Sequence, residues 1–232
     1  MSTTETSTTG TTTSTTVTPA GDAVYLTGQV PPAAQAQIDA VRRTPPGSTA
    51  ALLDALAPLR ELGFTQTQAA MIGFGRFPVA GPARWADDWL EPRFAADGTF
   101  SFHEGNDIPA ACGTPIRAPS DGTVRPGADQ FGGNNVIVTE SDGTYIYMAH
   151  LAGYPAGEGA GNPVRVGDVI GYVGRTGAAT GCHVHLEIHP RGGAAVDPKA
   201  FLDAWASEAL ADAPVIVDAV RADHGLGPAT AG

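Results

Sequence analysis

Lysine is nearly absent from this sequence: of its 232 residues, only Lys199 is a lysine. Lysine and arginine together number 13 against 24 acidic residues, which gives a formal net charge of −11. Nucleic-acid binding needs a positively charged surface, so this balance argues against a nucleic-acid partner. The same charge would repel an anionic membrane. No run of about 18 apolar residues occurs either, which argues against a membrane-spanning segment.

Cysteine is scarce as well. Cys112 and Cys182 permit one disulfide, and two unrelated buried thiols are the alternative. The N-terminal stretch MSTTETSTTGTTTSTTVTPAG lacks the basic and apolar pattern of a signal peptide. Its Thr/Ser-rich composition cannot bury enough surface to fold. We expect either an extended spacer that follows a targeting segment or a disordered tail.

The length of the chain suits one core of ordinary size with appendages. Changes in composition divide it into five segments. In order, we expect a disordered segment, a linker, a helical hairpin, the main domain, and a C-terminal helix with a disordered tail: 1–20, 21–48, 49–75, 76–203 and 204–232.

The sequence pattern of the main domain is typical of a β protein. Short apolar stretches alternate with turn signals such as DGT, GGN and GD, and NNVIVTE, TYIYMAHL, PVRVGDVIGYVG and CHVHLEIH are predicted strands. Upstream, STAALLDALAPLRELG has the apolar spacing of an amphipathic helix, with Gly63 as its stop. Helical spacing returns in PKAFLDAWASEALAD. The sequence therefore predicts a mainly β fold with a small N-terminal helical segment and a C-terminal helix.

Histidines are concentrated in GCHVHLEIH, which holds three of the six in the chain at alternate positions. Period two is that of one face of a strand, so His183 and His185 should point the same way. In HEGND, His103 and Asp107 are four apart and share a face in an extended or a helical segment. Two histidines and one carboxylate, with water in the fourth position, make an open catalytic zinc site. The spacing does not say which histidine of the pair binds the metal.

Three segments, HEGNDIPAACGTPIRAPSDGTV, YMAHL and GRTGAATGCHVHLEI, resemble the signature segments of the lysostaphin-type (LytM-type) zinc metalloendopeptidases. These enzymes cut peptide bonds in bacterial cell walls. The resemblance implies a compact antiparallel, sandwich-like catalytic domain related to the lipoyl/biotinyl hybrid motif, with one zinc ion and a peptidoglycan peptide as substrate. Matched position by position, it implies that His103, Asp107 and His185 bind zinc and that His150 and His183 are catalytic.

Further assignments follow from the same segments. Three residues in Gly-rich turns are candidates for substrate contacts, with a role in the turn as the alternative: Asn134, Asn135 and Thr180. Cys112 and Cys182 adjoin the two segments that converge on the metal, so we predict a disulfide between them. A bridge would contribute about 4 kcal/mol by chain-entropy arithmetic. It favours an extracytoplasmic location, whether secreted, periplasmic or wall-associated, although no signal peptide is visible.

Other polar residues have two interpretations. Glu187 either hydrogen-bonds to a ligand histidine or is a solvated strand residue. His189 and His224 are expected at the surface. Three carboxylates upstream of the main strands are either solvated or reach the metal in an inhibited form: Asp87, Asp88 and Glu91.

Two other functional classes compete with an enzyme. The strand phrases GTPIRAPSDGTV and PVRVGDVIGYVG resemble lipoyl and biotinyl carrier domains, but a carrier needs a lysine at a hairpin tip and Lys199 lies in the C-terminal segment. An inactive family member could act as a scaffold or activator that binds peptidoglycan or a partner hydrolase. Such members tend to lose site residues, whereas all five positions are filled here. We therefore predict a monomeric zinc metalloendopeptidase for cell-wall remodelling or lysis.

Overall fold

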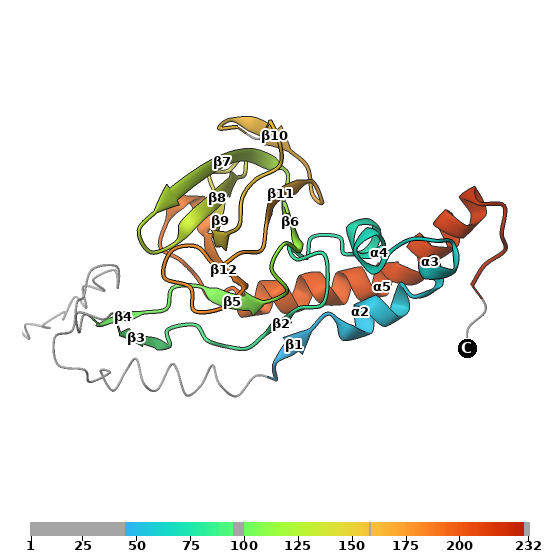
Figure 1. The fold of residues 1–232 in the computed structure, drawn as a ribbon, viewed down its shortest axis with the longest axis horizontal. Helices are drawn as coiled ribbons and strands as arrows, with labels where there is room; N and C mark the ends of the chain where they lie inside the picture. Colours follow the sequence, from blue (N-terminus) through green and yellow to red (C-terminus); the bar gives the residue numbers. More distant parts are fainter. Residues whose placement is uncertain (1–44, 95–99, 158, 230–232) are drawn as a thin grey trace, which may run out of the picture.

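The computed structural model describes residues 45–94, 100–157 and 159–229 (Figure 1). The segment 1–20 and most of the linker 21–48 lie outside the described residues. In the part of the chain that is described, no helix is both long enough and apolar enough to cross a membrane.

The described residues form a six-stranded antiparallel sheet with the order β10-β7-β8-β9-β12-β5. Its strands, in chain order, are β5 (Asn106–Pro109), β7 (Gly122–Asp129), β8 (Gly133–Thr139), β9 (Tyr145–Leu151), β10 (Asn162–Val164) and β12 (His183–His189). The mainly β, antiparallel fold that the sequence predicts is confirmed.

Smaller pairs of strands surround this sheet (Figure 1). They are β1 (Gly47–Ser48) with β2 (Arg84–Trp85), β3 (Pro92–Phe94) with β4 (Phe100–Phe102), and β6 (Pro115–Arg117) with β11 (Val169–Tyr172). The turn that follows β12 is the short 3-10 helix η2 (Pro190–Gly192).

Strand β12 shows why the sheet has one covered face and one open face. Val184, Leu186 and Ile188 are buried in the core. The alternate positions, which start at His183, are only partly buried until the strand ends. Because side chains alternate across a strand, burial of the apolar set turns the polar set to the other face.

Four helices occur in the described residues: α2 (Ala50–Ala55), α3 (Pro58–Glu61), α4 (Gln66–Gly73) and α5 (Lys199–Asp223). The predicted N-terminal helical segment and C-terminal helix are confirmed. The first predicted helix is divided into α2 and α3, because Pro58 has no N–H to continue the helical hydrogen bonds and instead occupies the first turn of α3. Thr65 begins α4 with a capping box that includes Gln68.

The helices and the sheet share one hydrophobic core. Helices α2, α3 and α4 pack against α5 (Figure 1), and Leu56 and Phe77 are fully buried in the same cluster as the sheet residue Val184. The single lysine is part of this junction: Lys199 is buried and donates to Asp203, which also accepts from the indole of Trp85 at 2.7 Å. The segment upstream of the sheet is therefore packed onto the domain.

Candidate metal centre and active site

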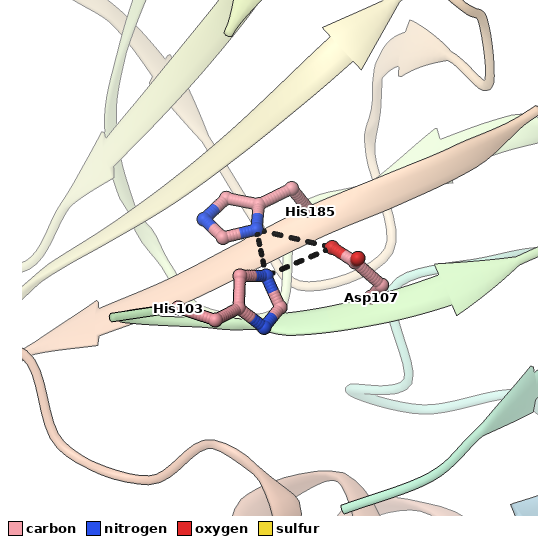
Figure 2. Close-up of side chains that lie close together, drawn as sticks. All are labelled: His103, Asp107 and His185. Atoms are coloured by element: carbon pink, nitrogen blue, oxygen red, sulfur yellow. Dashed lines mark hydrogen bonds and ion pairs between the residues drawn. The ribbon is translucent and has the colours of Figure 1, made fainter. Parts of the chain in front are cut away.

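Three side chains from distant parts of the chain point toward one another beside β5 and β12 (Figure 2). His103 Nε2 lies 2.8 Å from His185 Nδ1, and Asp107 Oδ1 lies 3.1 Å from each of these nitrogens. Two imidazole nitrogens and a carboxylate oxygen that converge in this way can hold a metal ion. The donor set fits zinc, because neutral imidazole and carboxylate are zinc ligands and oxygen-only sites suit calcium or magnesium.

The strand register brings two of the three residues together. Asp107 on β5 lies directly opposite His185 on β12. Residues opposite each other in an antiparallel pair have their side chains on the same face with Cβ atoms about 5 Å apart. His103 lies between β4 and β5, and its backbone bonds to Leu90 and Glu91 hold this connection in place.

The outward-facing nitrogens of the two histidines are held by acceptors. His103 Nδ1 lies 2.9 Å from the carbonyl oxygen of Asp88, and His185 Nε2 lies 2.8 Å from Glu187 Oε1. A carbonyl and a carboxylate only accept, so in the neutral rings that metal binding requires, these outward nitrogens carry the protons. His103 Nε2 and His185 Nδ1 then offer lone pairs to the ion. Of the two interpretations of Glu187, the hydrogen bond to a candidate ligand is the one that the structure contains.

Asp107 presents one oxygen to the cluster and the other to an arginine. Its Oδ2 accepts from Arg93 Nη2 at 3.0 Å, and Arg93 also pairs with Glu91 at 2.7 Å. Burial raises the pKa of Asp107, but in the metal-free site hydrogen bonds from the protonated rings of His103 and His185 outweigh burial and hold the pKa well below its usual range. The carboxylate is therefore ionised, as a metal ligand must be.

Of the upstream carboxylates, Asp87 is buried, whereas Asp88 and Glu91 are partly buried. Asp87 is 8% exposed. Asp88 accepts from the backbone N–H of Asp107 at 3.2 Å, and burial raises its pKa to about 6. Its carboxylate lies 3.5 Å from His103 Nδ1, the nitrogen that faces away from the cluster. In the described residues, this segment therefore supports the candidate ligands from outside and adds no donor to them.

Two further histidines lie beside the cluster. The ring centroids of His150 and His183 are 4.6 Å apart, and His183 Nε2 is 3.6 Å from Asp107 Oδ1. The Nδ1 atoms of the two rings donate to carbonyl oxygens at 2.9 Å, those of Thr176 and Gly181. The remaining nitrogens, the two Nε2 atoms, are thus available for proton transfer.

A β-bulge aims His150 into the site. Between the pairs Asn134–Leu151 and Val136–Met148, β9 has two residues opposite one on β8, and His150 adopts a φ of 66°. Regular alternation would place His150 and Tyr147 on opposite faces because they are three positions apart. The bulge allows both side chains to line the same cleft.

The histidines lie in a cleft of about 700 Å³. Among its described lining residues, Thr180 is present, whereas Asn134 and Asn135 are not. Asn134 donates to the Leu151 carbonyl and Asn135 donates to Asp129, so both side chains hold the loop. These bonds favour the alternative role in the turn, and substrate contact by the two asparagines stays a prediction.

Several lining residues carry no motif signal in the sequence. They include Arg93, Glu104, Phe131 and Tyr147. Phe131 is 68% exposed, on a turn whose carbonyl oxygen accepts from Ala178 N at 2.8 Å. The sequence predicted the strand that contains Tyr147. It did not predict that Tyr147 lines the cleft together with His150, because the bulge between them breaks the alternation.

The disulfide between Cys112 and Cys182 is present, as predicted. It joins residues 70 positions apart, one shortly after β5 and the other directly before β12. The bridge thus crosslinks the two strands that carry Asp107 and His185.

His189 is not a surface residue, and the prediction that it is one was wrong. It is 9% exposed, and its ring stacks on Tyr145 with centroids 4.2 Å apart. The last polar position of β12 is covered because Tyr145 lies directly opposite it on β9. His224, in contrast, is exposed as expected.

Comparison with known proteins gives a family match over part of the chain. Residues 101–198 match the model of Peptidase family M23. This confirms the resemblance to the lysostaphin-type endopeptidases.

Two curated relatives and one solved structure illustrate the match. The DD-carboxypeptidase/endopeptidase Mpg of Neisseria meningitidis is 40% identical over 95 residues, which are 40% of this chain and 21% of that protein. The L-Ala–D-Glu endopeptidase of Bacillus subtilis is 35% identical over 139 residues, 55% of this chain and 42% of that protein. The catalytic domain of lysostaphin from Staphylococcus simulans is 29% identical with a TM-score of 0.46, covering 51% of this chain and 91% of that chain. The chain thus spans less than half the length of these curated relatives.

Gly105 leaves room for the ring of His185, and Gly105→Ala tests this contact. An added Cβ would overlap that ring, 2.7 Å from its Nε2, and would also lie 2.7 Å from the backbone oxygen of Leu186. We expect the substitution to displace the ring and weaken metal binding by about 10- to 100-fold, the range for disturbed ligand positioning. Zinc affinity would be measured by competition with a chromophoric chelator.

Gly153→Ala is the matched control, since no heavy atom lies within 4 Å of a Cβ at Gly153. Unchanged zinc affinity in Gly105→Ala would show that the His185 ring adapts without loss of the site.

Proposed function

We propose that this protein is a zinc-dependent metalloendopeptidase that hydrolyses peptide bonds in the stems or cross-links of peptidoglycan. The observation that carries the proposal is the convergence of His103 Nε2, Asp107 Oδ1 and His185 Nδ1 in a cleft that also holds His150 and His183. The first three residues match the number of protein ligands in a catalytic zinc site, and the two further histidines are suited to proton transfer.

When bound, zinc supplies Lewis-acid polarisation of the scissile carbonyl and lowers the pKa of an attacking water. The chain's own residues would move the protons. Burial lowers the pKa of His150, which keeps its imidazole neutral near pH 7 and able to accept a proton. His150 and His183 each have Nδ1 fixed on a carbonyl oxygen, so Nε2 is the atom that would take a proton from water and return it to the leaving amine.

Substrate class and location are proposed from two supports. The relatives named above act as a DD-carboxypeptidase/endopeptidase and as an L-Ala–D-Glu endopeptidase. These names refer to different bonds. Our proposal therefore names the substrate class, a peptide bond of peptidoglycan, and does not assign a particular bond. The Cys112–Cys182 disulfide favours an oxidising compartment, so we infer that the protein acts outside the cytoplasm.

Metal removal and restoration test the function directly. Purified cell walls of several cross-link types would be incubated with zinc-loaded protein, with chelator-treated protein, and with the treated protein after zinc is added back. We expect the loaded and restored samples to release peptides with new termini and the treated sample to release none, because all proposed chemistry depends on the ion. Mass spectrometry of the soluble peptides identifies the bond.

Full zinc occupancy with no released peptide from any wall would contradict the endopeptidase proposal. It would support the alternative of an inactive scaffold or activator that binds peptidoglycan.

A further inference from the structure

The polar face of β12 carries a third histidine that the proposed mechanism does not use. His189 is buried at the end of the strand, four residues after His185. Tyr145 lies opposite it on β9 and stacks on its ring at an interplanar angle of 12°. The ring is therefore held in one plane by packing.

Both nitrogens of this ring face acceptors. His189 Nε2 lies 2.7 Å from Glu187 Oε2, and His189 Nδ1 lies 2.9 Å from the carbonyl oxygen of Gly193. Neither oxygen can donate, so Nε2 must carry a proton to bond to Glu187, and Nδ1 must carry one to bond to Gly193. A ring with two such anchors has a fixed position as well as a fixed plane.

Glu187 transmits this position to the candidate ligand. Its Oε2 accepts from His189, and its Oε1 accepts from His185 Nε2 at 2.8 Å. Each carboxylate oxygen of Glu187 therefore faces one histidine nitrogen, and the side chain accepts at both oxygens. The three residues alternate along β12 about 6.6 Å apart, a span that one glutamate side chain can bridge on either side.

We propose that His189 is a positioning residue for the metal ligand His185, and that it acts through Glu187. A carboxylate with one hydrogen bond can rotate about its terminal torsion, whereas donors on both oxygens fix its plane. With Oε1 fixed, the ring of His185 is fixed, and its Nδ1 is directed at His103 and Asp107. The inference rests on the proposed zinc site and extends it to a residue beyond the histidine pair.

Two amide substitutions test the hydrogen bonds of the two His189 nitrogens separately. In His189→Gln, the amide nitrogen stands near the place of Nε2 and can still donate to Glu187. In His189→Asn, it stands near the place of Nδ1 and can reach only Gly193. Both variants lose the stack on Tyr145, so they are matched in packing. We expect Asn to weaken zinc binding by about 10- to 100-fold and Gln to retain most of the affinity.

The measurement is the zinc dissociation constant of the full chain by chelator competition, with the unfolding temperature of the metal-free form recorded for each variant. Glu187→Ala and the double variant Glu187→Ala/His189→Asn complete a double-mutant cycle for zinc affinity. If His189 acts through Glu187, the double variant should bind zinc as weakly as Glu187→Ala alone. Additive losses in the cycle would contradict that route.

The outcomes are distinguishable from those of the proposed function. Wild-type protein that binds no zinc would overturn the proposed metalloenzyme and this inference together. Wild-type protein that binds zinc, with Asn and Gln variants that bind it equally well or equally poorly, would overturn the positioning role of His189 alone.

Discussion

Replacing His185 with alanine should remove zinc and peptidase activity together, whereas replacing His183 should remove activity and leave zinc bound. His185 Nδ1 lies within 3.1 Å of both other candidate ligand atoms. His183 Nε2 approaches only the edge of the cluster, 3.6 Å from Asp107 Oδ1, beside the ring of His150. We expect His183→Ala to lower kcat/KM by about 10²- to 10⁴-fold, the usual contribution of a general acid or base.

Metal content after dialysis and release of wall peptides would be measured on the same preparations. His224→Ala is the control, because it removes an exposed histidine far along the chain from both segments. If His183→Ala lost the metal and His185→Ala kept it, the roles of the two histidines would be reversed. His183 and His185 lie two positions apart on the same face of one strand. The two substitutions therefore disturb the same part of the fold, and a difference between them reports on the roles of the side chains.

Removing the disulfide should cost about 4 kcal/mol of unfolding free energy, because the bridge closes a loop between residues 70 positions apart. A double Cys112→Ser/Cys182→Ser variant would be compared with wild-type protein by denaturant unfolding of the metal-free forms. The effect should extend to the site, since Cys182 directly precedes His183 and Cys112 follows the strand of Asp107. We therefore also expect weaker zinc binding in the variant.

Reductant provides the control for this prediction. It should lower the unfolding free energy of the wild-type protein toward that of the double variant and leave the variant unchanged. Equal stability of oxidised and reduced wild-type protein would show that the bridge does not stabilise the fold.

The strands and the cluster residues were largely predictable from the sequence. Alternation in CHVHLEIH sets which side chains of β12 face the core, and the burial of Val184 and Leu186 agrees with that pattern. The turn signals between apolar stretches predicted a mainly β domain, and the family resemblance implied that its sheet is antiparallel. His103, Asp107 and His185 lie together as the motifs suggested, although their role as ligands remains a prediction.

Features that depend on contacts between strands were not predictable in the same way. His189 was expected at the surface because periodicity reports a face and not what covers it, and here Tyr145 of the neighbouring strand covers the ring. Asp88 holds the ring of His103 through its backbone carbonyl, which no side-chain pattern reveals. Arg93 reaches Asp107 across 14 positions, and no motif marks the side chain of Arg93.

The amino-acid sequence by itself determined which side chains of β12 share a face, because the alternation of side chains along a strand is a local property of the backbone. The tertiary structure alone decided how they are aimed. The register of β5 against β12 set Asp107 opposite His185, and the bulge in β9 turned His150 into the cleft. The acceptors around each imidazole selected the nitrogen that faces the site. These depend on hydrogen bonds between segments far apart in the chain, and such bonds exist only once the chain has folded.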